Sequence, residues 1–368
     1  MKNACIVWKN QRNGCFDGGV SLISDALRRY GYVFTETRTL FQADEKTFVN
    51  AVEQLLAAYE NVFVITDENW LIAAKTNLSV RLGEENFQGI ARGAGIFTKQ
   101  NKSCFLLSVE AGETGVAYVE STCMPYLERK YGFRKDRTVI RSVGANEQFV
   151  RNLIAKAQTI DEGKMQYFYT RKYDEDVLEI VYDENVSKKL ERDVVRIFAE
   201  GLDDSVYAME DTPLAAQLVQ MAKLRGKRLS VAESFTGGGM ARRIVSVSGA
   251  SEIYFEGLNT YNELSKIKRL GVGENTLQTF GAVSEHTAYE MAAGLIATGD
   301  CDVSIATTGL AGPKSDRTGL PVGLCYIAVG TKERVFVYRY KFDGTREEIT
   351  EKAINYALFL AYKQLKVL

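Results

Sequence analysis

Residues 228–245 read RLSVAESFTGGGMARRIV, an apolar run followed by a glycine-rich turn and a helical pattern. This order predicts a buried strand over 228–232, a tight turn, and a helix over about 238–245. Glycines in such a turn let the backbone approach a ligand closely, and the N-terminus of a helix offers free N–H groups to an anion. A plain strand-to-helix turn without a ligand is the alternative interpretation.

Strands and helices also alternate downstream of this stretch. Apolar runs predict three further strands, and a capping box that begins at Thr345 opens the last helix. The first helix of this region is expected to have Thr212 as N-cap and Pro213 as its first residue. Residues 211–368 are therefore expected to form one α/β domain, an α/β/α sandwich, with strands over 302–307, 322–329 and 334–342 and a closing helix over 346–365.

The first half of the chain repeats the alternation with other spacings. Apolar runs over 4–8, 33–40 and 61–66 are separated by helical patterns, which predicts a doubly wound parallel sheet. Over 165–182 the pattern changes to two alternating strands followed by a helix, which predicts a small α+β unit. We therefore expect an α/β protein in three parts, which comprise residues 1–160, 161–210 and 211–368.

Composition excludes several classes of protein. The 368 residues are 46% hydrophobic and 25% charged, as in an ordinary globular protein with more than one core. The 6 cysteines form no CxxC pair, so neither a zinc knuckle nor a disulfide framework is expected. No apolar window is long enough to span a membrane and no signal-peptide pattern opens the sequence, so we expect a cytoplasmic protein. Residues 211–368 carry 19 Lys and Arg against 16 Asp and Glu, too small an excess to predict nucleic-acid binding.

The chain has 1 histidine, His286, and this count limits the chemistry. Ser-His-Asp triads and HExxH zinc sites need at least one well-placed imidazole. His286 follows Ser284, the expected N-cap of an amphipathic helix, and is interpreted as an exposed residue of the first turn. A catalytic site in this chain would therefore rely on Ser, Lys, Tyr, Asp, Glu or a bound cofactor.

Two loops that directly follow predicted strands combine hydroxyl groups with glycine. Ser234 follows the strand of residues 228–232, and Thr308 follows the strand of residues 302–307. Open α/β sheets bind ligands at the carboxyl ends of their strands. Both loops are therefore candidate parts of one binding site.

A third segment carries Tyr261 and, five residues later, Lys266 in the first turn of a short helix. The N-terminus of a helix disfavours an ammonium charge, so a partly buried Lys there has its pKa lowered toward the range of a general base. A solvated basic face is the alternative interpretation, because Lys268 and Arg269 follow immediately.

Together the three segments resemble the C-terminal domain of the CinA (competence/damage-inducible) family. The shared motifs are Ser-x-Thr-Gly-Gly from Ser234, Tyr with Lys five residues on from Tyr261, and Thr-Gly-x-Ala-Gly-Pro from Thr308. The resemblance covers residues 213–368. Two positions depart from the family pattern: Phe235 replaces a Cys, and Lys314-Ser315-Asp316 replaces a glycine-rich stretch at the rim of the pocket.

In the family this domain is a nicotinamide mononucleotide (NMN) deamidase, an amidohydrolase that converts the carboxamide to the acid and ammonia. The resemblance implies Ser234 as nucleophile, Lys266 as base and Tyr261 as an aid to proton transfer, a chemistry that needs no histidine. It also implies a small pyridine nucleotide as substrate, no metal, no cofactor and a homodimer. The glycine-rich N–H groups could form an oxyanion hole or a phosphate cradle. The residues expected to bind the substrate are Thr236, Gly237, Gly238, Thr308, Gly309, Ala311, Gly312 and Arg346.

The first half resembles the N-terminal domain of the same family, which is similar to molybdopterin-binding proteins. Members with ADP-ribose pyrophosphatase activity carry Gly-Asp-Glu after the first strand, where this chain has Val7-Trp8-Lys9-Asn10. They carry a glycine-rich turn and two acids after the third strand, where this chain has Thr66-Asp67-Glu68-Asn69-Trp70. We therefore expect a degenerate domain without a phosphate cradle, in which Asp17, Asp67 and Glu68 are solvated loop acids. Binding of a cation by these acids is the alternative interpretation.

Two other functions remain open at this point. One is a non-enzymatic interaction protein linked to competence or DNA damage, as the family name suggests. The other is residual ADP-ribose pyrophosphatase activity in the first half through altered residues. The presence of Ser234, Tyr261 and Lys266 in one chain favours the enzyme, because an interaction protein does not need that combination.

Overall fold

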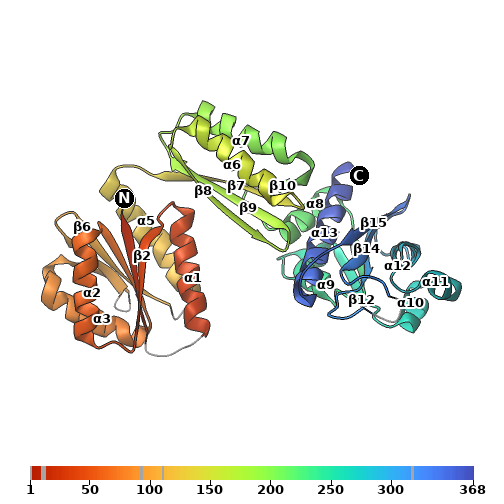
Figure 1. The fold of residues 1–368 in the computed structure, drawn as a ribbon, viewed down its shortest axis with the longest axis horizontal. Coiled ribbons are helices and arrows are strands. Elements are labelled where there is room, and N and C mark those ends of the chain that lie inside the picture. The colour runs from red at the N-terminus through yellow and green to blue at the C-terminus, as the bar shows by residue number, and fades with distance from the viewer. Residues whose placement is uncertain (1, 10–13, 92–93, 110–111, 316–318) are drawn as a thin grey trace. The chain divides into compact units, whose positions relative to one another are not determined.

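The structure is a computed structural model that describes residues 2–9, 14–91, 94–109, 112–315 and 319–368 (Figure 1). The chain forms two compact units. The first unit comprises Met1–Arg137, Gly163–Gln166 and Val181–Ser187, and the second comprises Thr138–Glu162, Tyr167–Ile180 and Lys188–Leu368. The three-part division expected from the sequence stays a prediction.

A six-stranded sheet in the order β2-β1-β3-β6-β5-β4 forms the first unit. The first four strands of this order are parallel, and β5 and β4 extend the sheet as an antiparallel hairpin that the sequence did not predict. Side chains alternate along β1, so Trp8 packs with α2 and α3 while Val7 packs on the opposite face with α1 and α5. The predicted doubly wound arrangement is confirmed. The elements are β1 (Asn3–Lys9), α1 (Gly14–Arg29), β2 (Phe34–Phe41), α2 (Glu45–Ala58), β3 (Asn61–Thr66), α3 (Glu68–Leu82), β4 (Phe87–Ala91), β5 (Ala94–Lys99), β6 (Lys102–Ser108), α4 (Gly112–Tyr118) and α5 (Met124–Tyr131).

A second, four-stranded sheet has the order β10-β7-β9-β8. Figure 1 shows its two helices side by side along one face. The predicted α+β unit is present, and it also contains a strand and a helix, β7 and α6, that begin before residue 160. The elements are β7 (Lys135–Val143), α6 (Glu147–Asp161), β8 (Met165–Lys172), β9 (Glu175–Asp183), α7 (Lys188–Leu202) and β10 (Val206–Ala208).

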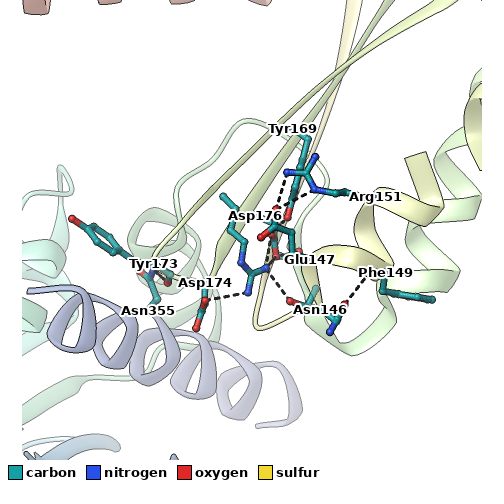
Figure 2. A network of polar contacts seen from close by, with 12 residues as sticks. Asn146, Glu147, Phe149, Arg151, Tyr169, Tyr173, Asp174, Asp176 and Asn355 are labelled. Atoms are coloured by element: carbon teal, nitrogen blue, oxygen red, sulfur yellow. Dashed lines mark hydrogen bonds and ion pairs between the residues drawn. The ribbon is translucent and has the colours of Figure 1, made fainter. Parts of the chain in front are cut away.

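The hairpin between β8 and β9 ends in a two-residue turn, in which Tyr173 and Asp174 have positive φ values of 52° and 58°. Just below the turn, Arg171 donates hydrogen bonds to Asp174 at 3.1 Å and to Asp176 at 2.8 Å (Figure 2). Tyr169 donates a further hydrogen bond to Asp176 at 2.6 Å. These contacts among buried and half-buried groups hold the tip of the hairpin in one conformation.

A third sheet, in the order β12-β11-β13-β14-β15, forms the core of the C-terminal part. Its first three strands are parallel, and β14 and β15 are antiparallel to their neighbours. One face packs against α8, α9 and α13, and the other packs against α10, α11 and α12. The expected α/β/α sandwich is confirmed. The elements are α8 (Leu214–Arg225), β11 (Leu229–Glu233), α9 (Gly239–Val245), β12 (Tyr254–Asn259), α10 (Glu263–Leu270), α11 (Glu274–Phe280), α12 (Glu285–Ala297), β13 (Val303–Gly309), β14 (Leu324–Thr331), β15 (Val335–Lys341) and α13 (Arg346–Val367).

Helix ends in this part follow the capping signals of the sequence with one exception. Ser284 accepts a hydrogen bond from the N–H of Thr287 as N-cap of α12, and Thr345 forms the predicted capping box of α13. The exception is α8, which begins at Leu214 with Pro213 as N-cap, one residue later than predicted. Pro213 has an extended ψ of 151°, so it lies just outside the helix, and Thr212 does not cap it.

Candidate active site

The three polar segments predicted from the sequence meet at one edge of the C-terminal sheet. Strands β11, β12 and β13 are parallel neighbours, so their carboxyl ends lie together. The N–H of Ser234 donates to the carbonyl of Thr307 at 3.1 Å, and the N–H of Thr260 donates to the carbonyl of Glu233 at 2.7 Å. The backbone ladder thus continues past the strand ends and holds the loops in register.

A buried lysine contacts a buried serine at this edge. The Nζ of Lys266 lies 3.0 Å from the Oγ of Ser234, with exposed fractions of 1% and 8% for the two residues. The same Nζ donates to the carbonyls of Thr260 at 2.6 Å and of Tyr261 at 3.4 Å. Burial lowers the pKa of Lys266 to about 8, against the opposing effect of Glu263. Lys266 is therefore not the solvated basic residue of the alternative interpretation.

The hydrogen-bond partners of Lys266 determine the direction of the nitrogen lone pair when the amine is neutral. A neutral amine has two N–H donors and one lone pair, whereas an ammonium has three donors and no acceptor. The carbonyls of Thr260 and Tyr261 can only accept, so they take the two N–H groups. The lone pair then faces the hydroxyl of Ser234, which can donate its proton to it. This geometry suits a lysine that acts as a general base toward a serine.

Tyr261 contributes its backbone to this group of residues. Its side chain is 65% exposed, and within the part of the chain that the structure describes its hydroxyl forms no hydrogen bond. The contact to Lys266 comes from the carbonyl of Tyr261 instead. A role of the phenol in proton transfer stays a prediction.

The glycine-rich turn holds an internal carboxylate where the sequence suggested a ligand. The N–H groups of Gly238, Met240 and Ala241 donate to the side chain of Glu233 at 3.0, 3.1 and 2.9 Å. These donors at the start of α9 are therefore occupied, and of the three only Gly238 is a residue that was predicted to bind the substrate. Sequence reasoning missed Glu233, although an acid at the end of a buried strand next to Ser234 was a signal for it.

The other predicted residues of this turn have structural contacts. The hydroxyl of Thr236 lies 2.8 Å from the hydroxyl of Thr307 on the neighbouring strand. Gly237 and Gly238 have positive φ values of 60° and 94°, which residues with a side chain rarely adopt. The glycines thus allow the tight turn that places Ser234 beyond the end of β11.

Phe235, which departs from the family pattern, is buried with an exposed fraction of 6%. It packs in a small apolar cluster with Ala311, Phe342 and Ile349. The aromatic side chain therefore fills space between the two loops and α13, and it leaves the contact between Ser234 and Lys266 intact.

The loop after β13 is connected to α13. Arg346, the first residue of α13, donates to the carbonyl of Gly312 at 2.7 Å, and Thr308 donates to the carbonyl of Ala282 at 2.5 Å. Gly309 packs closely on β14, since an added Cβ would lie 2.5 Å from the Cβ of Cys325. The structure brings Arg346 to the predicted substrate loop and gives no contact between Arg346 and Ser234. The second departure from the family pattern is Lys314-Ser315-Asp316, of which Asp316 lies outside the described residues.

Among the residues of the first unit that the structure describes, no comparable group lies at the carboxyl ends of the parallel strands. Asp67 is the N-cap of α3 and accepts the N–H of Trp70 at 3.0 Å, and the ring of Trp70 lies 4.4 Å from that of Trp8. Lys9 forms an ion pair with Asp17 at 2.6 Å. Asp17 is exposed on α1, in agreement with a solvated acid, whereas Asp67 is half-buried as the N-cap of α3, and Asn10 lies outside the described residues. Within the described ranges no group of three or more His, Cys, Asp or Glu could hold a metal ion.

Fold and site together define an α/β/α protein with a buried Ser–Lys pair at the carboxyl edge of a mostly parallel sheet. The CinA C-terminal domain family matches residues 211–365. A relative from Caldicellulosiruptor saccharolyticus, provisionally named a competence-damage inducible protein, is 33% identical over 295 residues, which are 76% of this chain and 68% of the relative. The chain therefore belongs to the CinA family, and it spans about two thirds of the length of this relative.

Two solved structures each resemble part of this chain. The competence damage-inducible protein A from Klebsiella pneumoniae has 33% identity and a TM-score of 0.41, and covers 42% of this chain and 95% of its own. The tungsten cofactor synthesizing protein MoaB from Pyrococcus furiosus has 14% identity and a TM-score of 0.24, and covers 35% of this chain and 97% of its own. In the described residues, no helix combines the length and the apolar character needed to cross a membrane.

Proposed function

We propose that the C-terminal part of this protein hydrolyses the carboxamide of NMN to nicotinic acid mononucleotide and ammonia. The observation that carries the proposal is the contact of 3.0 Å between the Nζ of Lys266 and the Oγ of Ser234. Membership of the CinA family supports the choice of a pyridine nucleotide as substrate.

In this proposal Ser234 attacks the carboxamide carbon while Lys266 takes the proton of its hydroxyl. The tetrahedral intermediate then collapses, and the ammonium of Lys266 returns the proton to the leaving nitrogen, which departs as ammonia. An ester between Ser234 and the nicotinoyl group remains. Water attacks the ester while Lys266 again takes a proton, the bond to the serine oxygen breaks as Lys266 returns this proton to that oxygen, and the acid is released.

The developing oxyanion needs hydrogen-bond donors close to the nucleophile. The N–H groups at the start of α9 are occupied by Glu233. Among the described residues, the N–H groups of Phe235 and Thr236 have no hydrogen-bond partner. The N–H of the residue that follows a nucleophile is a common oxyanion donor, so Phe235 and Thr236 are the proposed donors here.

The first prediction is that Ser234→Ala abolishes release of ammonia from NMN. Loss of a catalytic nucleophile lowers turnover by roughly four to six orders of magnitude, because no covalent intermediate can form. The measurement is ammonia production by the purified full-length protein with excess chelator present, since the mechanism uses no metal.

Ser246→Ala is the matched control, because Ser246 is an exposed residue at the end of α9 whose hydroxyl donates to the carbonyl of Arg243. It should keep wild-type turnover. Near wild-type turnover of Ser234→Ala, or activity that depends on an added divalent cation, contradicts the proposal.

A further inference from the structure

The proposed mechanism assigns no task to the side chain of Glu233, which is buried with an exposed fraction of 1%. A buried carboxylate is costly unless hydrogen bonds and charges compensate it. In the described part of the chain Glu233 forms no ion pair. Its partners are the three backbone N–H groups of Gly238, Met240 and Ala241, together with the positive end of α9.

Glu233 and Ser234 face opposite sides of the sheet. Val231, two residues before Glu233, belongs to the core with α8, α9 and α13, and Ala232, two residues before Ser234, belongs to the core with α10 and α12. The contacts agree with this alternation, since Glu233 binds the start of α9 while Ser234 meets Lys266 of α10. On one face of the strand end, the carboxylate of Glu233 therefore binds the start of α9, and we call this contact the anchor. The other face carries the nucleophile.

The anchor closes the turn that holds Ser234. The N–H of Ser234 is fixed to Thr307, and its carbonyl accepts the N–H of Gly237 at 3.2 Å. The next residue, Gly238, is tied back to Glu233 at 3.0 Å. The five-residue turn is thus held at both ends, and the end nearer α9 is held by the carboxylate.

The backbone of Glu233 also supports the lysine. Its carbonyl accepts the N–H of Thr260 at 2.7 Å, and the carbonyl of Thr260 accepts a hydrogen bond from Lys266 at 2.6 Å. A shift of Glu233 would therefore move the supports of Ser234 and of Lys266 together. A displacement of about 1 Å in such a pair lowers a rate by up to about 100-fold.

We propose that Glu233 is a positioning residue, whose carboxylate, bound to the start of α9, holds Ser234 within hydrogen-bond distance of Lys266. This inference rests on the proposed function. It assigns a task to a residue that touches neither the substrate nor the reacting atoms.

Glu233→Gln tests the inference with little change in shape. The amide keeps one acceptor oxygen and replaces the other with an NH₂ group, which faces N–H donors instead of accepting from them. We expect kcat for NMN to fall by about 10- to 100-fold while KM changes less than about threefold, because the substrate contacts are not touched. Glu233→Asp keeps the charge on a shorter side chain and should recover part of kcat.

Glu290→Gln is the matched control for loss of a carboxylate that caps a helix. Glu290 accepts the N–H of Gly273 at 2.8 Å and the hydroxyl of Thr276 at 2.7 Å next to α11, away from the turn of Ser234. It should lower the midpoint of thermal unfolding without a comparable loss of kcat at 25 °C. Equal losses of kcat in the two Gln variants, or an unchanged kcat in Glu233→Gln, overturn the inference.

A crystal structure of Glu233→Gln gives a readout that does not depend on activity. We expect the distance from Nζ of Lys266 to Oγ of Ser234 to exceed the hydrogen-bond limit of about 3.5 Å. An unchanged distance overturns the positioning role even if the wild-type protein proves inactive toward NMN. Failure of the wild-type assay alone contradicts the proposed function and leaves this structural test in force.

Discussion

At the scale of single residues, the state of Lys266 predicts how activity depends on pH. Burial lowers its pKa to about 8, and only the neutral amine can take the proton of Ser234. The neutral form is the minor form below that pH. We therefore expect kcat/KM for NMN to rise about tenfold per pH unit up to about pH 8 and to level off above it. A profile that falls with rising pH over this range contradicts the role of Lys266 as base.

Lys266→Met should remove the rise of kcat/KM with pH, because the side chain of Met is of similar length and cannot accept a proton. The residual rate should be roughly 100- to 10,000-fold lower, the usual contribution of a general base. Lys268→Met, an exposed position on the same helix, is the control and should keep the wild-type profile.

The residues of the site were partly predictable from sequence. Ser234, Thr308 and Lys266 follow or neighbour the ends of parallel strands, and parallel strands bring such positions together whatever the details of packing. The role of Glu233 depends on which face of the sheet its side chain occupies and on the exact start of α9, and neither is fixed by a local pattern. The exposure of Tyr261 likewise depends on how α10 packs.

At the scale of elements, the hairpin between β8 and β9 packs on α13. The side chain of Asn355, buried with an exposed fraction of 1%, donates to the carbonyl of Tyr173 at 2.7 Å (Figure 2). It also accepts a hydrogen bond from Arg243 of α9. The hydroxyl of Tyr173 donates to Glu347 in the first turn of α13 at 3.1 Å. The hairpin therefore contacts the same helix that presents Arg346 to the substrate loop.

We predict that Asn355→Ala lowers the free energy of unfolding by about 1–3 kcal/mol, because the half-buried carbonyl of Tyr173 and the half-buried guanidinium of Arg243 each lose a hydrogen bond. Unfolding in urea measures the change. Asn275→Ala, an exposed position on α11, is the control and should stay within about 0.5 kcal/mol of the wild type. A loss in Asn355→Ala as small as in this control would show that the hairpin contact does not stabilise the second unit.

Elements with strong local signals were predictable, and the others were not. The capping box at Thr345 and the N-cap at Ser284 fixed the starts of α13 and α12 within a residue. The sequence did not reveal β12, an edge strand whose positions alternate between half-buried and exposed and which contains a glycine. The hairpin of β4 and β5 is short and glycine-containing as well, so tertiary pairing and not propensity makes these strands.

At the scale of the whole molecule, we predict that the protein does not hydrolyse ADP-ribose. A diphosphate needs backbone donors and cations that offset its charge. In the first unit, Asp67 already caps the start of α3, and Trp8 and Trp70 pack against each other beside it. The measurement is AMP release from ADP-ribose with magnesium, manganese or cobalt. Turnover near one per second, within the usual range of enzymes, would restore the first unit as an active site.

The alternation of Glu233 and Ser234 across the sheet limits which lengths β11 can have. Insertion or deletion of one residue in this strand would exchange the two side chains, because successive residues point to opposite faces. The carboxylate would then meet Lys266 as an ion pair, and the hydroxyl would lie against the start of α9. Such a chain could keep its composition and its sandwich yet have no nucleophile. The loops around the sheet can therefore vary in length during evolution, whereas the number of residues in β11 has to be kept.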